Sequence, residues 1–177
     1  ALNVVSLLFM LPLSIGMALT LRVSFLIGAG APDTARLISR SSLILAACTA
    51  LVFAILLFVF SQGIAALYTS DADVQTVTVR LLMFAALFQV ADVIQVTCIS
   101  ALRGYKDTGI PLLIMLFSFW GVGLPLGYIL TFTDVIAPAM GAAGFWIGLT
   151  GGLASASVLL GWRLFRYRPA TTGQLAN

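Results

Sequence analysis

The sequence contains no histidine and no glutamate, and only 8% of its 177 residues are charged. Soluble domains contain roughly 25% charged residues because their surfaces face water. With 61% hydrophobic residues, this chain cannot cover a soluble surface. The absence of histidine also excludes the common histidine-based catalytic triads and zinc sites. Lipid is therefore the solvent that this composition fits.

Cysteine and basic residues are scarce as well. Cys48 and Cys98 lie inside apolar runs, far from any CxxC spacing, and we interpret both as small core residues. Nine basic residues against six aspartates give a net charge of +3. No basic stripe or aromatic stacking platform accompanies this excess, so no nucleic-acid partner is expected. A small basic excess is instead typical of the cytoplasmic loops of membrane proteins.

Five stretches are long and apolar enough to cross a bilayer, which takes about 20 residues per helix. They cover about residues 2–27, 37–68, 74–102, 111–132 and 144–165. Segments rich in Gly, Pro and Asp join them, as expected for turns. We therefore predict one all-α transmembrane unit over residues 1–168, followed by a cytoplasmic polar tail at 169–177. Because Ala1 opens an apolar run without a basic leader, we also expect the chain to begin within a longer protein.

The basic residues predict an orientation. In a five-helix zigzag only Arg80 falls on one side, and eight basic residues fall on the other: Arg22, Arg36, Arg40, Arg103, Lys106, Arg163, Arg166 and Arg168. The positive-inside rule places the side with many basic residues in the cytoplasm. The first and third connections and the C-terminus are thus expected there.

Asp92 is the residue that most strongly indicates a function. It lies well inside the stretch 74–102, with apolar turns on both sides. A carboxylate at mid-membrane costs at least about 2.5–3.5 kcal/mol on insertion scales, and such a cost persists where the group is useful. Gln89 and Gln95 lie three positions to either side and share roughly one helical face with it. This face offers oxygen ligands for a cation, sodium being the candidate metal at Asp92, or a protonatable acid. The structural alternative is a polar clamp between helices.

Polar and aromatic side chains extend the candidate site. The first stretch carries Asn3 and Ser6 together with Pro12, which can kink a helix, so this stretch could form a cavity wall or merely a packing irregularity. The cavity-lining candidates are Asn3, Ser6, Phe9 and Phe88.

Glycines mark two places where helices could approach closely. Gly144, Gly148 and Gly152 follow one another at four-residue spacing, which predicts a packing ridge. The run 121–127 holds three glycines and a proline, and it could be a hinge or a packing surface, with packing favoured.

Several of these runs together suggest a family. The segments 1–23, 123–128 and 141–146, the sequence Phe88-Gln89-Val90-Ala91-Asp92, and the loop Leu102-Arg103-Gly104-Tyr105-Lys106-Asp107 resemble the multidrug and toxic compound extrusion (MATE) transporters of the NorM branch. The resemblance spans nearly all of residues 1–168. It implies twelve helices in two six-helix lobes that work as a cation-coupled antiporter. This chain would supply helices eight to twelve, five helices of the C-terminal lobe.

The resemblance also implies roles and partners. Asp92 would match the coupling-ion aspartate, while Phe88 stands where members often have tyrosine. The expected activity is export of drugs and other small amphipathic or cationic substrates, without enzymatic chemistry. We expect no cofactor besides the coupling ion, sodium or proton. The expected partners are the lipid bilayer and the missing N-terminal lobe, in a multi-pass protein of the bacterial inner (plasma) membrane.

Other functions remain as alternatives. A lipid-linked or polysaccharide flippase of the same superfamily would need a larger basic cavity, and no mid-membrane Arg or Lys occurs here. An intramembrane enzyme would need a nucleophile and a base, which Asp92 alone does not supply. An ion channel predicts a pore helix, which the sequence does not show.

Overall fold

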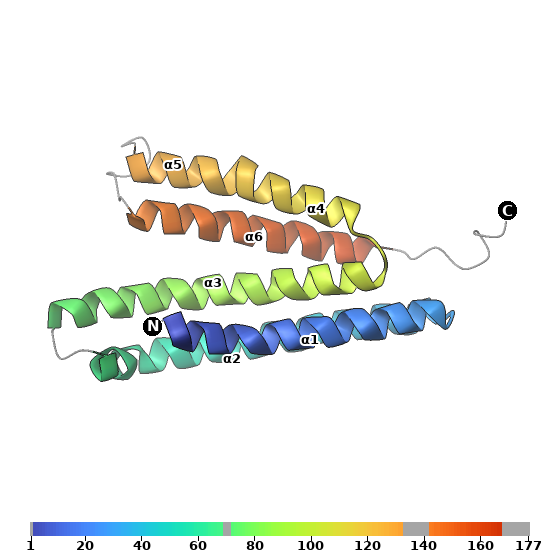
Figure 1. Cartoon of the computed structure of the whole chain (residues 1–177), viewed down its shortest axis with the longest axis horizontal. Coiled ribbons are helices and arrows are strands. Elements are labelled where there is room, and N and C mark those ends of the chain that lie inside the picture. The colour runs from blue at the N-terminus through green and yellow to red at the C-terminus, as the bar shows by residue number, and fades with distance from the viewer. Residues whose placement is uncertain (1, 69–71, 133–141, 168–177) are drawn as a thin grey trace.

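The computed structural model describes residues 2–68, 72–132 and 142–167, and the regular elements within these ranges are all helical (Figure 1). The elements are α1 (Leu2–Gly28), α2 (Pro32–Tyr68), α3 (Ala72–Gly104), α4 (Gly109–Leu116), the π-helical η1 (Phe117–Gly123), α5 (Leu124–Phe132) and α6 (Ala142–Arg166). Because α4, η1 and α5 follow one another without a break, they form one rod. The predicted all-α membrane fold is confirmed. The tail at 169–177 lies outside the described residues.

Four helical spans within the described residues are long and apolar enough to cross a membrane. They are Pro32–Ile64, Leu82–Gly104, Gly109–Phe132 and Gly144–Arg166. A shorter apolar stretch, Leu13–Gly28, lies in α1. The backbone of α1 nevertheless continues to Leu2, which gives a helix of 27 residues.

Helix α2 begins earlier than expected. It starts at Pro32 rather than near residue 37, and Asp33 lies in its first turn. A proline is well suited to the first helical position because its fixed φ matches the helix and its missing N–H has no partner to lose there. The positive end of the helix dipole lies at the N-terminus, where it stabilises the negative charge of the Asp33 carboxylate. Arg36 and Arg40 therefore lie on a regular helix rather than in a loop.

Helix α3 lies at the centre of the arrangement. In Figure 1, α6 lies between α3 and the α4–α5 rod, while α1 and α2 pack on the other side of α3. Hydrogen bonds tie these layers together: Ser157 Oγ donates to the Ala91 carbonyl at 2.6 Å, and Thr20 Oγ1 donates to the Ser100 carbonyl at 2.9 Å. Such bonds suit a lipid-embedded core, because packing and interhelical hydrogen bonds replace the hydrophobic drive between helices.

The two described connections lie at the same end of the bundle. The turn between α1 and α2, the turn between α3 and α4, and the end of α6 all lie at one end (Figure 1). We call it the basic end, because Arg22, Arg36, Arg40, Arg103, Lys106, Arg163 and Arg166 lie in or near these segments. The start of α1 and the start of α3 lie at the opposite end.

Glycines form a close seam between α6 and the rod. A Cβ at Gly148 would collide with the Gly127 backbone, and one at Gly152 would lie 2.9 Å from Gly123 Cα. A Cβ at Gly144 would lie 2.5 Å from the Leu130 carbonyl oxygen. Both glycine runs singled out in the sequence therefore meet in one contact, where the backbones approach as closely as small residues allow.

Candidate functional site

Asp92 is buried within α3. The residue is 8% exposed, and its Oδ2 atom is buried without a hydrogen-bond partner among the described residues. A buried carboxylate oxygen without a hydrogen-bond partner is costly, and a bound cation or a proton would satisfy it. Asp92 is thus the centre of the candidate site.

The neighbours of Asp92 in sequence show where its side chain is directed. Val93 packs against Ala46 and Ala50 of α2, whereas the Ala91 carbonyl accepts the hydrogen bond from Ser157 of α6. A helix turns by about 100° per residue, so Asp92 lies between these two contacts, on a third side of α3. At one edge of this side α1 is close, since a Cβ at Gly16 would lie 2.6 Å from Ser100 Oγ.

The two glutamines diverge from the aspartate. Gln89 is buried and lines a cavity of about 230 Å³ between α1, α2 and α3, together with Ile15, Ala46, Thr49, Ala50, Phe53, Val93 and Thr97. Gln95 Nε2 instead donates to Met115 Sδ on α4 at 3.1 Å. Residues three positions apart differ by about 60° around a helix, so Gln89 and Gln95 are separated by roughly 120°. The three residues share a broad arc of α3 rather than one compact cluster.

The cavity-lining candidates are only partly described. Asn3, Ser6 and Phe9 lie in α1, but their side chains are outside the described residues. Phe88 lies one turn before Asp92 and is partly buried, and its ring meets Trp146 of α6 edge-on with ring centroids 6.4 Å apart. Phe88 thus lies one turn from the aspartate on α3 and packs against α6.

The chemistry available at Asp92 is limited by its surroundings. Within the described ranges no three His, Cys, Asp or Glu residues lie together as a metal site would require. A single carboxylate can take up a proton, or it can give one or two oxygen ligands to a monovalent cation whose other ligands come from amide or carbonyl oxygens.

A second polar cluster, which the sequence did not reveal, lies at the basic end. Arg163 contacts Asp107 Oδ2 through Nη2 at 2.7 Å and Nε at 2.9 Å. The hydroxyls of Ser39 and Tyr105 are 3.0 Å apart, and the Tyr105 ring lies 5.0 Å from that of Tyr167. Burial raises the pKa of Tyr105, so its hydroxyl stays neutral.

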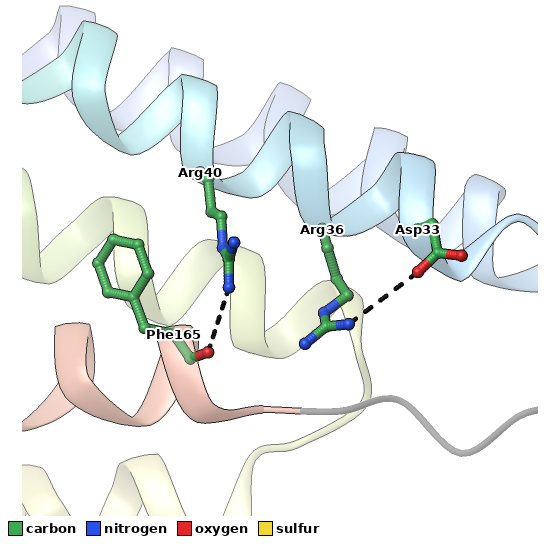
Figure 2. A network of polar contacts seen from close by, with 4 residues as sticks. All are labelled: Asp33, Arg36, Arg40 and Phe165. Carbon is green, nitrogen blue, oxygen red and sulfur yellow. Dashed lines mark hydrogen bonds and ion pairs between the residues drawn. The ribbon is translucent and has the colours of Figure 1, made fainter.

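Arg40 adds a further link at this end. Its Nη2 donates to the Phe165 carbonyl at 3.4 Å, so it reaches from α2 to the last turn of α6 (Figure 2). Arginine is suited to this position because the unpaired carbonyls at a helix C-terminus carry partial negative charge. The cluster therefore joins α2, the α3–α4 turn and α6 at the basic end.

Comparison with known proteins identifies relatives over most of the chain. The family model described as MatE matches residues 1–129. The chain is 46% identical over 166 residues to "Probable multidrug resistance protein NorM" of Idiomarina loihiensis, covering 94% of this chain and 36% of the relative. It is 43% identical over 164 residues to "Multidrug resistance protein MdtK" of Edwardsiella ictaluri, covering 93% of this chain and 36% of the relative. The chain thus spans about a third of the length of these relatives.

A solved structure shares the fold. The crystal structure of the eukaryotic MATE transporter AtDTX14 matches with a TM-score of 0.84 and 24% identity, over 94% of this chain and 36% of that chain. The match of the MatE family model to residues 1–129, together with the sequence identities above 40%, confirms the family predicted from the sequence. This chain belongs to the MatE family of transporters.

Proposed function

We propose that this chain is part of a secondary antiporter that exports drugs and other small amphipathic or cationic compounds in exchange for sodium ions or protons, with Asp92 as the coupling acid. The observation that carries the proposal is the buried Oδ2 of Asp92, which has no partner among the described residues. The names of the bacterial relatives, which are multidrug resistance proteins, support the export of drugs.

The coupling follows from the cost of the buried charge. An ionised carboxyl at mid-membrane is expensive, and a bound cation or proton relieves that cost. The free energy of the lobe therefore depends on whether a cation or a proton is bound at Asp92. A ligand shifts a conformational equilibrium by as much as its affinity differs between the two states. In the proposed cycle, a cation binds near Asp92 from outside, the lobes rearrange, and the substrate leaves.

The remaining ligands and the substrate cavity are assigned to parts of the transporter outside this chain. The chain would form five helices of the C-terminal lobe, and the N-terminal lobe would complete the cavity. Gln89, Asn3, Ser6, Phe9 and Phe88 remain the candidates for lining it. We place the protein in the bacterial inner membrane as a multi-pass protein, with the basic end and the C-terminus in the cytoplasm, because eight of nine basic residues fall on that side.

The other functions have less support. A flippase for anionic lipid-linked sugars would require basic residues at depth, but the sequence has no Arg or Lys at 81–102 or 107–162. An intramembrane hydrolase would require a base beside a nucleophile. Asp92 has Gln89, Val93 and Gln95 on the neighbouring positions, which supply neither.

The test is dye efflux from vesicles that contain the full-length transporter, under imposed sodium or proton gradients and with matched expression. Asp92→Asn keeps the size of the side chain but removes its charge, so gradient-driven efflux should fall to near background. Asp107→Asn is the matched control: it makes the same change at an aspartate of the basic end, which Arg163 contacts at 2.7 and 2.9 Å, and efflux per folded molecule should persist. Near-normal efflux by Asp92→Asn would reduce Asp92 to a packing feature.

A further inference from the structure

On the side of α3 that faces away from Asp92, helices α2 and α6 leave an apolar groove, which we call the α2–α6 groove. It consists of two adjoining hollows of about 380 and 720 Å³, which share Ile94, Ser157 and Val158. Ile94 follows Asp92 by two positions and therefore points roughly 200° around the helix from it. The groove and the Asp92 side chain thus face nearly opposite directions.

Small residues hollow out the groove. Ala47, Ala154 and Gly161 line it, and a Cβ at Gly161 would meet nothing within 4 Å. The Ser157 hydroxyl is bonded to the backbone carbonyls of Ala91 and Leu153, so its proton is not available to a ligand. The surface that the groove presents is therefore mainly hydrocarbon.

Two arginines flank the end of the groove near the basic end. Trp162 and Phe165 line this end. The Arg40 guanidinium lies 5.4 Å from the centre of the Phe165 ring, and that of Arg166 lies 4.9 Å from the Trp162 ring. Figure 2 shows Arg36, one turn before Arg40, extending from α2 toward the same side. Positive charge thus collects where the apolar groove meets the membrane surface.

These charges are not neutralised by carboxylates. Within the described ranges no acidic side chain pairs with Arg40 or Arg166. Arg36 reaches only Asp33, at 4.0 Å, and the Asp33 side chain is 98% exposed, so this pair is weak. A guanidinium offers five N–H donors, and phosphate is a partner that it can bind through two of them. The end of the groove can therefore accept an anion.

The groove is longer than the hydrocarbon part of one leaflet is deep, so an acyl chain can lie along it. The lining residues of α2 run from Leu43 to Phe58, a rise of about 22 Å at 1.5 Å per residue. One leaflet contributes about 15 Å of a hydrocarbon core that is about 30 Å thick. Protein cover is needed on the opposite side of α3, where the Asp92 carboxyl cannot face lipid. The apolar lining, with Arg40 and Arg166 at its end near the membrane surface, makes an anionic lipid the occupant that suits the groove.

We propose that the α2–α6 groove binds a phospholipid with an anionic headgroup. Arg40 and Arg166 hold the headgroup, and an acyl chain lies along the groove between α2 and α6. Basic pockets between transmembrane helices at a membrane surface bind anionic headgroups in this way. The site does not depend on the coupling role of Asp92, so Asp92→Asn should bind the lipid like the unmodified protein.

The test uses the full-length transporter, purified in a neutral detergent and titrated separately with phosphatidylglycerol and phosphatidylcholine. Native mass spectrometry measures the bound fraction of each lipid. Phosphatidylglycerol should bind more tightly. Arg40→Gln and Arg166→Gln should each weaken it by roughly five-fold, the factor expected for one juxtamembrane charge. Gly161→Leu should weaken both lipids, because it fills the groove without removing a charge. Arg22→Gln, an exposed arginine at the basic end of α1, is the matched control and should change neither lipid.

Several outcomes would overturn the proposal. Equal binding of the two lipids would contradict the headgroup site. So would unchanged phosphatidylglycerol binding by the Arg40→Gln, Arg166→Gln double variant. An equal loss in Arg22→Gln would indicate general attraction to positive charge. Absence of bound lipid in the unmodified protein would show that other helices of the transporter cover the groove. Melting temperatures in lipid-free detergent establish that each variant is folded.

Discussion

Asp92 and Asp107 belong to the same part of the chain, but their environments differ. Asp107 follows α3 at the basic end, where Arg163 contacts its Oδ2 through two nitrogens at 2.7 and 2.9 Å. Asp92 lies in the membrane-spanning part of α3, and its Oδ2 has no partner among the described residues. The partner of a paired aspartate is part of the fold, so the contribution of that aspartate does not depend on a bound coupling ion. An unpaired one contributes an energy that changes with what binds it, and this difference separates a structural acid from a coupling acid.

The largest effect should come from a change that touches neither aspartate. Gly148→Leu would drive a side chain into the Gly127 backbone and separate α6 from the rod. We expect a loss on the order of 4 kcal/mol or more, seen as aggregation or a collapsed melting transition of the full-length protein in detergent. This variant shows what a purely structural failure looks like.

Its control is Gly161→Leu on the same helix, where a Cβ has open space, and this variant should remain folded. A normal melting temperature for Gly148→Leu would contradict the seam between α6 and the rod.

Asp107→Asn should have the next largest effect on stability. It leaves the Arg163 charge without its partner at a position where the two side chains are only 27% and 11% exposed. Hydrogen bonds to charged groups contribute about 1.5–3 kcal/mol, so a loss of that order is expected in thermal unfolding. Residual efflux per folded molecule should still depend on the gradient.

A second change sharpens this prediction. Adding Arg163→Gln to Asp107→Asn removes the unpaired charge, so the double variant should be more stable than the sum of the single losses implies. Strict additivity would mean that the two residues do not interact.

The sequence predicted the all-α membrane fold and the burial of Asp92, because hydrophobic length and one mid-membrane acid are local signals. It could not predict the pairing of Asp107 with Arg163, because the partners are 56 positions apart and only the packing of α6 brings them together. The sequence also placed Gln89 and Gln95 on roughly one face of a helix. Residue spacing indicates such a face, but it does not show which other helices pack around it. Gln89 lines a cavity beside α1 and α2, whereas Gln95 contacts Met115 on α4.

Tyr105→Phe should have a smaller effect at the same end of the molecule. It removes the contact with the Ser39 hydroxyl at 3.0 Å, while Ser39 keeps its bond to the Ala35 carbonyl at 2.8 Å. A loss of about 0.5–1.5 kcal/mol is expected, measured by thermal unfolding. Ser39→Ala should give a similar value, and a much larger loss in either variant would mean that the cluster has another partner.

Asp92→Asn should have the smallest effect on stability. Removing the charge of a carboxylate whose Oδ2 has no hydrogen-bond partner among the described residues relieves a cost rather than breaking a bond, so the melting temperature should be unchanged or slightly raised in sodium-free buffer. A loss comparable to that of Asp107→Asn would indicate a structural partner for Asp92 and would end the contrast between the two acids.

The most direct test of the coupling role is an equilibrium measurement that does not depend on expression or on a gradient. Coupling is reciprocal. A cation or proton whose binding is coupled to that of the substrate must therefore change the affinity of the protein for the substrate. In the full-length protein, the Kd of a fluorescent cationic substrate should vary with sodium concentration or with pH, and Asp92→Asn should abolish that variation while Asp107→Asn retains it. The same cation dependence in Asp92→Asn as in the unmodified protein would contradict the account.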